Sequence, residues 1–274
     1  MDFSLIRRLL CGLALLASGA ANAAPAPLTL PAGYKLVWAD EFTQDGLPDP
    51  AKWLHDKSRN KDGWYNNEQQ YYAGPRAENA RASQGKLLIT ATREDLKNEP
   101  DWGGQHYSSA RLITRGKGDW TYGFFEIRAR MPCGKGTWPA IWTLGSAGNW
   151  PADGELDILE QLGKDPERIF STVHRTAGSG GNGAGNGRQL PDACKAFHNY
   201  QMLWTHELIR FGVDGVEHFS YANPKTGVAA WPFDAPQFLI LNLAIGGDLG
   251  GPVDDAIFPV TLEVDHVRVY QAPR

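Results

Sequence analysis

The sequence is poor in cysteine, in charge of one sign and in long apolar runs. Of its 274 residues only 3 are cysteines, and 27 basic residues nearly balance 31 acidic ones, for a net charge of −4. So few cysteines exclude a scaffold held by many disulfides. Scattered Lys and Arg exclude the basic surface of a nucleic-acid-binding protein. Beyond the N-terminus no segment reaches about eighteen consecutive apolar residues, so we expect no membrane partner for the mature chain.

The one long apolar run lies at the N-terminus. Arg7 and Arg8 precede the run LLCGLALLASGA, and Ala21-Asn22-Ala23 fits a small-residue cleavage pattern. These features predict a secretory signal peptide over residues 1–23, and therefore secretion to the extracellular space or the periplasm. Cys133 and Cys194 remain in the mature chain. In an oxidising compartment they either form one disulfide or stay free, and the sequence leaves both open.

Residues 24–274 are predicted to form a single all-β domain. Short segments rich in strand formers recur between turn residues, and Asp214-Gly215 has the composition of a hairpin turn. No stretch has a convincing helical period. The glycine-rich segment from Gly178 to Gly187 predicts a flexible loop within the domain. The expected fold is an antiparallel β-sandwich. The predicted strands span residues 87–92, 122–131, 209–221 (a hairpin), 238–245 and 264–270.

The stretch GELDILEQLG, residues 154–163, places three acids out of phase. In a strand Glu155 and Asp157 share a face, whereas Glu160 points to the other. In a helix Glu155 and Glu160 would lie about 140° apart and could not converge. One extra residue, a β-bulge near Ile158 or Leu159, would bring Glu160 onto the face of the other two acids.

Three aligned carboxylates repel one another, so we expect a use for their charge. A solvated acidic strand face is the simplest interpretation. Metal binding by oxygen ligands is the second. The third is glycoside cleavage by a nucleophile and an acid, which in retaining enzymes lie roughly 5–5.5 Å apart. Asp157 would then hydrogen-bond a neighbouring acid and decide which one holds the proton.

The chain contains 10 tryptophans, which is many for its length. Large exposed aromatic rings bind the apolar faces of sugars, although core packing is the usual role of a single Trp. Trp138 and Trp142 are four residues apart on one predicted strand and so point to the same face. They form either a sugar-binding platform or an aromatic core pair.

Several of these motifs together resemble glycoside hydrolase family sixteen. GELDILE resembles the family's signature, and its Glu-x-Asp-x-x-Glu spacing is similar to the laminarinase-type branch, which carries the bulge. The lichenase-type branch has one residue fewer. Further similar motifs follow in the family's order over nearly the whole mature chain: NNEQQYY (66–72), SARL (109–112), TWPAIW (137–142), TVH (172–174), LNLAIGG (241–247) and VDHVRVYQ (264–271).

The resemblance implies a concanavalin-like jelly roll of two curved antiparallel sheets with a cleft on the concave face. It implies a retaining endo-β-1,3-glucanase in which Glu155 is the nucleophile, Glu160 the acid/base and Asp157 the assisting acid. No cofactor is expected for the chemistry, the partner is a polysaccharide, and the protein is expected to be a monomer. The side chains expected to bind substrate are Trp138, Trp142, Trp150, Asn66, Arg111 and His174.

The resemblance also implies a structural calcium ion on the convex side. Asp265 would supply a carboxylate, and Glu41 and Gly85 would supply backbone carbonyls, a ligand set that suits calcium.

Other functions remain open on the sequence. Within the same family they are cleavage of mixed-linkage β-1,3-1,4-glucan or of a galactan, and transglycosylation. Outside catalysis they are a glucan-binding protein or a calcium-dependent lectin. Both glutamates are present, which argues against a binding protein that has lost its catalytic acids.

Overall fold

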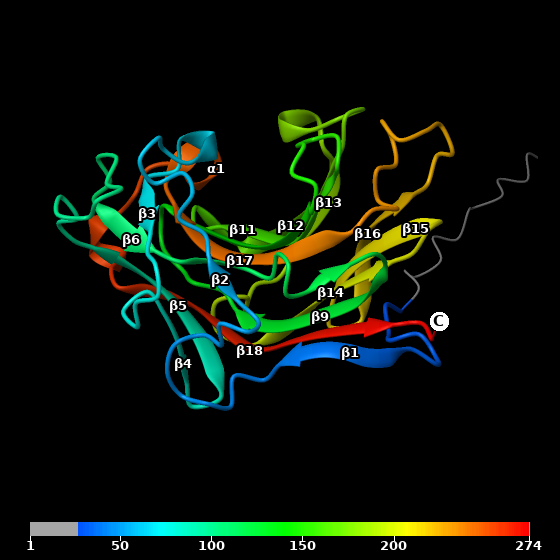
Figure 1. Ribbon diagram of the computed structural model, residues 1–274, viewed down its shortest axis with the longest axis horizontal. Coiled ribbons are helices and arrows are strands. Elements are labelled where there is room, and N and C mark those ends of the chain that lie inside the picture. The colour runs from blue at the N-terminus through cyan, green and yellow to red at the C-terminus, as the bar shows by residue number, and fades with distance from the viewer. Residues whose placement is uncertain (1–26, 274) are drawn as a thin grey trace, which may run out of the picture.

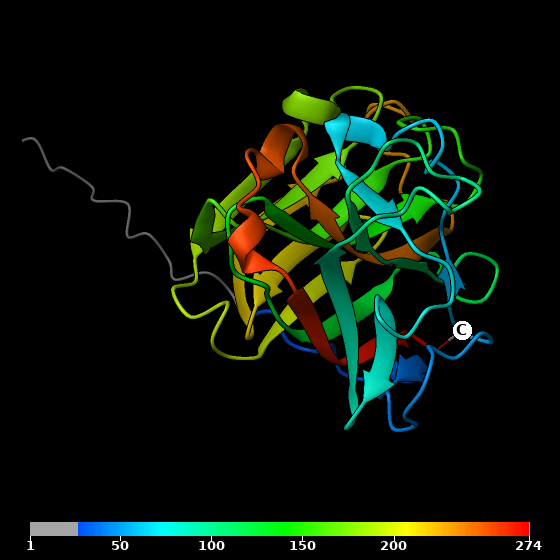
Figure 2. The ribbon, with the colours of Figure 1, turned by 90° about the vertical axis from the view of Figure 1, so that its left-hand side faces the viewer.

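The computed structural model describes residues 27–273 as two stacked β-sheets (Figures 1 and 2). The predicted signal peptide, residues 1–23, lies outside the described residues. Among the residues that are described, no helix is long and apolar enough to cross a membrane. Within residues 27–273 the regular elements other than strands are one helical turn and three 3₁₀ turns: α1 (Gly247–Gly250), η1 (Tyr65–Asn67), η2 (Gly180–Asn182) and η3 (Asp255–Ile257).

The first sheet has eight strands in the order β13-β12-β11-β10-β17-β7-β2, with β8 paired to β17. It curves so that its outer face is concave, with α1 at one rim and the η2 turn at the other (Figure 1). Its strands are β2 (Leu54–His55), β7 (Arg111–Ile113), β8 (Asp119–Trp120), β10 (Thr137–Gly145), β11 (Glu155–Leu162), β12 (Asp165–His174), β13 (Ala184–Gln189) and β17 (Gln237–Ile245).

The second sheet has ten strands in the order β16-β15-β14-β9-β18-β5-β6-β3, and β1 and β4 pair with β18 and β5. All the strand pairs are antiparallel except the parallel pair β3 and β6. Its strands are β1 (Lys35–Asp40), β3 (Gln70–Tyr72), β4 (Ala80–Ser83), β5 (Lys86–Arg93), β6 (Tyr107–Ser109), β9 (Gly123–Arg130), β14 (His198–Trp204), β15 (Leu208–Val213), β16 (Val216–Ala222) and β18 (Val260–Gln271).

The core lies between the inner faces of the two sheets. Phe125, Ile127 and Ala129 of β9 are fully buried there, as the alternation of that segment predicts. In the hairpin of β15 and β16, Asp214 and Gly215 have φ of 51° and 77°, the left-handed pair that a two-residue hairpin turn requires. All five predicted strand segments are confirmed, and so is the absence of a long helix from the described residues.

The glycine-rich segment was expected to be a flexible loop, and this is wrong for its second half. Residues 184–189 form β13, which pairs with β12 at the edge of the concave sheet. A Cβ atom at Gly185 would lie 2.5 Å from the Ser171 carbonyl oxygen, and one at Gly187 would lie 2.6 Å from that of Ile169. Glycine is needed at these two positions because a Cβ atom there would collide with the backbone of β12.

Cys133 and Cys194 form a disulfide, with their Cα atoms 5.7 Å apart and a sequence separation of 61. The bond joins the segment after β9 to the segment before β14. It therefore closes a long loop that contains β10, β11, β12 and β13.

Candidate active site

The centre of the concave sheet carries the expected β-bulge. On one side of β11, Asp157 pairs with Trp142 and Leu159 with Ile141, so Ile158 has no partner on β10. On the other side the register shifts between Asp157 and Glu160. Ile158 and Leu159 are both buried in the core. Two consecutive inward residues return Glu160 to the outer face, because a bulge reverses the alternation of all that follows.

The three acids meet on this face around His174 and two indoles. His174 Nε2 lies 3.0 Å from Asp157 Oδ2 and 3.8 Å from Glu155 Oε1. Trp150 Nε1 donates a hydrogen bond of 2.7 Å to Glu155 Oε2. Trp138 Nε1 donates one of 2.8 Å to Glu160 Oε1. The predicted convergence of the acids is therefore present, with a separate N–H donor for each glutamate.

Burial raises the pKa of all three acids. Burial, and then the charge of Asp157, raise the pKa of Glu155 to about 8. Burial raises the pKa of Glu160 to about 7, although the hydrogen bond from Trp138 lowers it. Asp157 is the most buried, 3% exposed, and burial and the charge of Glu160 hold its pKa well above the ordinary value. This face therefore holds carboxyl groups that keep protons near neutral pH.

Carboxyls this close share protons instead of titrating independently. Asp157 is hydrogen-bonded to Glu155, and burial together with the charge of Glu160 holds the pKa of Asp157 well above its ordinary value, so we infer that Asp157 carries the shared proton. A neutral Asp157 removes the second cause of the raised pKa of Glu155. The N–H of Trp150 and the nearby His174 then favour the Glu155 carboxylate. Both effects favour ionisation of Glu155, whereas burial favours the protonated form of Glu160.

The tryptophans differ in exposure. Trp138 is 7% exposed, whereas Trp150 is 53% exposed, an unusual state for so large an apolar ring beside a buried acid. Trp142 is half-buried on the same strand face as Trp138, and Ile141 between them points into the core, as predicted. The sugar-platform role of these rings stays a prediction.

Arg111 lies next to Trp142. Its guanidinium carbon is 4.7 Å from the ring centre of Trp142 and 5.2 Å from that of Trp64, and its Nε lies 3.0 Å from Asp56 Oδ2. The group is thus held rigidly between two indoles. Asn66 lies in η1, in the left-handed region with φ of 58°, and hydrogen-bonds Glu68.

Sequence reasoning missed a polar chain that runs behind Trp142. Trp142 Nε1 donates to Asn242 Oδ1 at 2.7 Å, and Asn242 Nδ2 donates to the Tyr72 hydroxyl at 3.0 Å. That hydroxyl donates to Glu68 Oε2 at 3.3 Å. Glu68 lies close enough to Glu160 for its charge to raise the pKa of Glu160. Its position within NNEQQYY, beside Asn66, was the available signal.

Among the described residues, two places carry carboxylate groups that are arranged as ligands for a cation would be. The ligand atoms of Glu155, Asp157 and His174 lie within 4.8 Å of one another, but the indole donor and the shared proton already account for these groups. The second position is at Asp265, which is half exposed, with its Oδ2 3.3 Å from His266 Nδ1 and 3.7 Å from Arg128 Nη1.

Strand pairing brings the other two predicted calcium ligands near Asp265. Asp40 pairs with Val267 and Leu87 with Val264, so the chain at Glu41 and at Gly85 runs beside Asp265. Arg268 binds both carboxylate oxygens of Glu41, at 2.7 and 2.9 Å. The Glu41 carboxylate is therefore already paired. Calcium binding by the Asp265 carboxylate and the backbone carbonyls of Glu41 and Gly85 stays a prediction.

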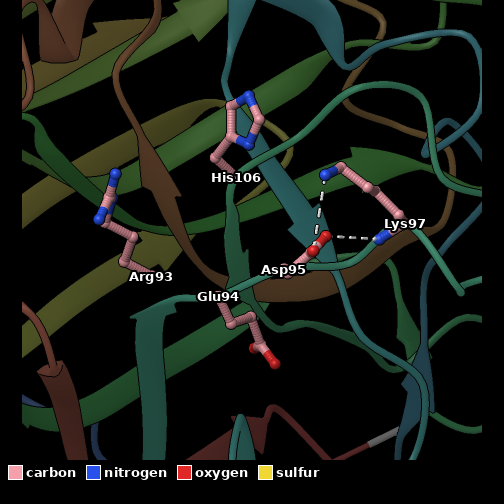
Figure 3. A pocket seen from close by; sticks show the side chains of 5 residues that line it. All are labelled: Arg93, Glu94, Asp95, Lys97 and His106. Carbon is pink, nitrogen blue, oxygen red and sulfur yellow. Dashed lines mark hydrogen bonds and ion pairs between the residues drawn. The ribbon is translucent and has the colours of Figure 1, made fainter.

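A separate surface pocket is formed by the segment after β5 and by His106 (Figure 3). Lys97 pairs with Asp95 at 3.6 Å, and Arg93 pairs with Asp255 at 3.1 Å. Glu94 pairs with Arg76, so four of the five lining residues are already engaged in ion pairs. Nothing in it resembles the convergent acids of β11.

The chain is similar to known proteins in both sequence and structure. The family model described as "Glycosyl hydrolases family 16" matches residues 67–256. The β-glucanase of Rhodothermus marinus is 45% identical over 277 residues, which cover 96% of this chain and 91% of that protein. The crystal structure of SCLam, a non-specific endo-β-1,3(4)-glucanase, is 49% identical with a TM-score of 0.88, covering 91% of this chain and 96% of SCLam.

A mutant of SCLam was crystallised with an oligosaccharide. This mutant holds 1,3-β-D-cellobiosyl-glucose at its active site. It is 48% identical to this chain with a TM-score of 0.87, and the match covers 91% of this chain and 100% of the mutant chain. Similarity at this level extends over both sheets of the sandwich.

Proposed function

The chain belongs to glycosyl hydrolase family 16, and on that premise we propose that it cleaves internal β-1,3 linkages of β-glucan with retention of anomeric configuration. The protein is a glycoside hydrolase with the jelly-roll fold of its relatives. The observation that carries the proposal is the bulge at Ile158, which brings Glu155, Asp157 and Glu160 together beneath indole N–H donors.

In the first step, the Glu155 carboxylate attacks the anomeric carbon. Glu160 gives its proton to the leaving glycosidic oxygen, so that bond breaks as the glycosyl–Glu155 ester forms. Protonated Asp157 donates to Glu155 and holds its orientation. The raised pKa of Glu160 keeps the acid protonated at the start, as general acid catalysis requires.

In the second step, Glu160 acts as a base. The negative charge of Glu155 is one cause of the raised pKa of Glu160. Ester formation removes that charge, so the pKa of Glu160 falls when the residue must accept a proton. Glu160 then deprotonates a water that attacks the anomeric carbon, which frees Glu155 and releases the sugar with its original configuration.

The substrate is a polysaccharide, as the oligosaccharide-bound SCLam mutant supports. We assign Trp138, Trp142 and Trp150 to stacking against sugar rings. Arg111, Asn66 and His174 are assigned to polar contacts near the cleavage point. Mixed-linkage β-1,3-1,4-glucan is a second candidate substrate, because SCLam is itself described as non-specific.

We further propose that the enzyme is a secreted monomer. The Cys133–Cys194 disulfide supports an oxidising destination, extracellular or periplasmic. We also propose a structural calcium ion held by Asp265 with the carbonyls of Glu41 and Gly85. The ion would stabilise the second, ten-stranded sheet, which forms the convex side of the molecule, and would take no part in the chemistry. Chelation would therefore lower the melting temperature more than the rate of the reaction.

Product analysis with purified protein tests the proposal. Laminarin, lichenan, agarose and carrageenan are incubated separately, and the anomer formed first is followed by proton NMR. We expect laminarin oligosaccharides of retained configuration, and no hydrolysis by Glu155→Gln or Glu160→Gln. Near-normal hydrolysis by Glu155→Gln, or the inverted anomer as first product, overturns the mechanism. Binding of laminarin without cleavage would identify a glucan-binding protein.

A further inference from the structure

The bulge leaves one backbone carbonyl in an unusual position. Because the register of β11 shifts against both β10 and β12, Ile158 stands outside the regular ladder. The Ile158 oxygen instead accepts a hydrogen bond of 2.8 Å from Ser171 Oγ. Ser171 is fully buried on β12, and its neighbours on the same strand face, Ile169 and Val173, are core residues. A hydroxyl in this apolar surrounding therefore replaces a ladder hydrogen bond.

A second side chain extends this contact into the other sheet. His218 lies on β16, the edge strand of the convex sheet, and its Nε2 is 2.9 Å from Ser171 Oγ. The two edges meet here, because Asn186 Nδ2 of β13 donates to the His218 carbonyl at 3.1 Å. The chain from His218 through Ser171 to Ile158 thus links the convex sheet to the bulge between the two glutamates.

The direction of the hydrogen bonds follows from proton counting. Ser171 has one hydroxyl proton and gives it to the Ile158 oxygen, so its oxygen accepts from a protonated His218 Nε2. Burial, with a smaller contribution from Arg188, lowers the pKa of His218 to about 4. The ring is therefore neutral at physiological pH and carries its single N–H at Nε2. Its Nδ1 is buried and makes no hydrogen bond to any described residue.

We propose that Ser171 and His218 are positioning residues, which hold the bulge at Ile158 and thereby set the place of Glu160 relative to Glu155. The proposal rests on the catalytic roles proposed above for these two glutamates. Ser171 points into the core and His218 belongs to the other sheet, so neither residue lies on the face that carries the acids. Loss of the hydroxyl would free the bulge to shift, and a displacement of about 1 Å at a reacting group can cost roughly a hundredfold in rate.

The test compares two variants on one strand face. Ser171→Ala removes the hydroxyl from the bulge, whereas Val173→Ala removes core methyl groups from the same face of β12 at a position that pairs with Leu156. For both we would measure the melting temperature, and kcat and KM on laminarin. For Ser171→Ala we expect kcat to fall about 10- to 100-fold with KM changed by less than about twofold. Val173→Ala should lose melting temperature but keep kcat.

Conservative variants provide the rescue. Ser171→Thr keeps the hydroxyl and should recover most of the lost kcat. His218→Gln keeps an N–H donor and should exceed His218→Leu in kcat. The proposal is overturned if Ser171→Ala keeps the wild-type kcat, or if Val173→Ala lowers kcat equally. Glu155→Gln separates the two hypotheses: if it stays active the proposed function fails, and if it is inactive while Ser171→Ala is fully active only the positioning role fails.

Discussion

Gly183 lies directly against the imidazole of His174. A Cβ atom at Gly183 would come within 2.8 Å of His174 Cε1 and 2.6 Å of Thr172 Cγ2. The φ of Gly183 is −58°, which any residue accepts, so only the absent side chain matters. The glycine-rich segment therefore forms part of the active site, because it leaves room for His174 beside Asp157.

We expect Gly183→Ala to lower kcat on laminarin by about tenfold or more, because the added methyl group pushes His174 away from the acids. Gly181→Ala is the matched control, since a Cβ there meets nothing within 4 Å. Steady-state kinetics of the two variants would check this. Equal rates would mean that the position of His174 does not matter for catalysis.

Trp138→Phe should move the alkaline limb of the kcat/KM profile to higher pH. The indole N–H stabilises the Glu160 carboxylate and lowers its pKa. Phenylalanine keeps an aromatic ring but lacks this donor, so Glu160 holds its proton to higher pH. Trp142→Phe, which loses a donor to Asn242 only, should leave the limb in place. A shift in both variants, or in neither, would contradict this assignment of the acid.

Glu68→Gln should move the same limb in the opposite direction. The negative charge of Glu68 raises the pKa of Glu160. Without the Glu68 charge the pKa of Glu160 is lower, so the protonated form of Glu160, which acts as the general acid, disappears at a lower pH. Glu167→Gln, which changes an exposed acid on β12, is the control. An unchanged pH profile in Glu68→Gln would show that this charge is too well screened to act on Glu160.

Glu160→Gln should stabilise the protein, and more so at pH 8 than at pH 5. The pKa of Glu160 is raised from 4.5 to about 7 on folding. The stability that this shift contributes is fully present below pH 4.5 and is lost as pH rises through 7. Glutamine avoids that loss and still accepts from Trp138. From the size of the shift we expect a gain of about 3 kcal/mol at pH 8. Thermal unfolding at both pH values measures it, and equal gains at both would refute the prediction.

Replacement of both cysteines should destabilise the fold without stopping catalysis. Without the bond the unfolded chain gains entropy. For a loop that spans 61 residues, this lowers the free energy of unfolding by about 4 kcal/mol, and measured losses of stability fall near 2–5 kcal/mol. Urea unfolding of Cys133→Ala/Cys194→Ala, with reduced wild-type protein as the control, checks the value. An unchanged midpoint would mean that the loop is held by its strand pairing alone.

Local pattern predicted those features of the fold that depend on near neighbours. The alternation of β9, the left-handed turn at Asp214 and Gly215, and the bulge in β11 all follow from the order of side chains within a few residues. The bulge was predictable because Glu160 is out of phase with Glu155. The geometry of a single strand or hairpin is enough to account for these three features.

The features that were missed depend on long-range approach. Tyr72 and Asn242 meet although 170 residues separate them, and the role of Glu68 depends on that meeting. The close packing of β13 on β12 cannot be read from a run of glycines, which is equally typical of a flexible loop. The disulfide stayed open for the same reason, since no local pattern reports the distance between Cys133 and Cys194.

The bulge also bears on how this active site tolerates change in the gene. In a regular strand, loss of one codon turns every later side chain to the opposite face. At Ile158 such a deletion would instead remove the supernumerary residue and leave all three acids in plain alternation. Insertion and deletion at this single position therefore connect two sequence lengths that present the same carboxyls.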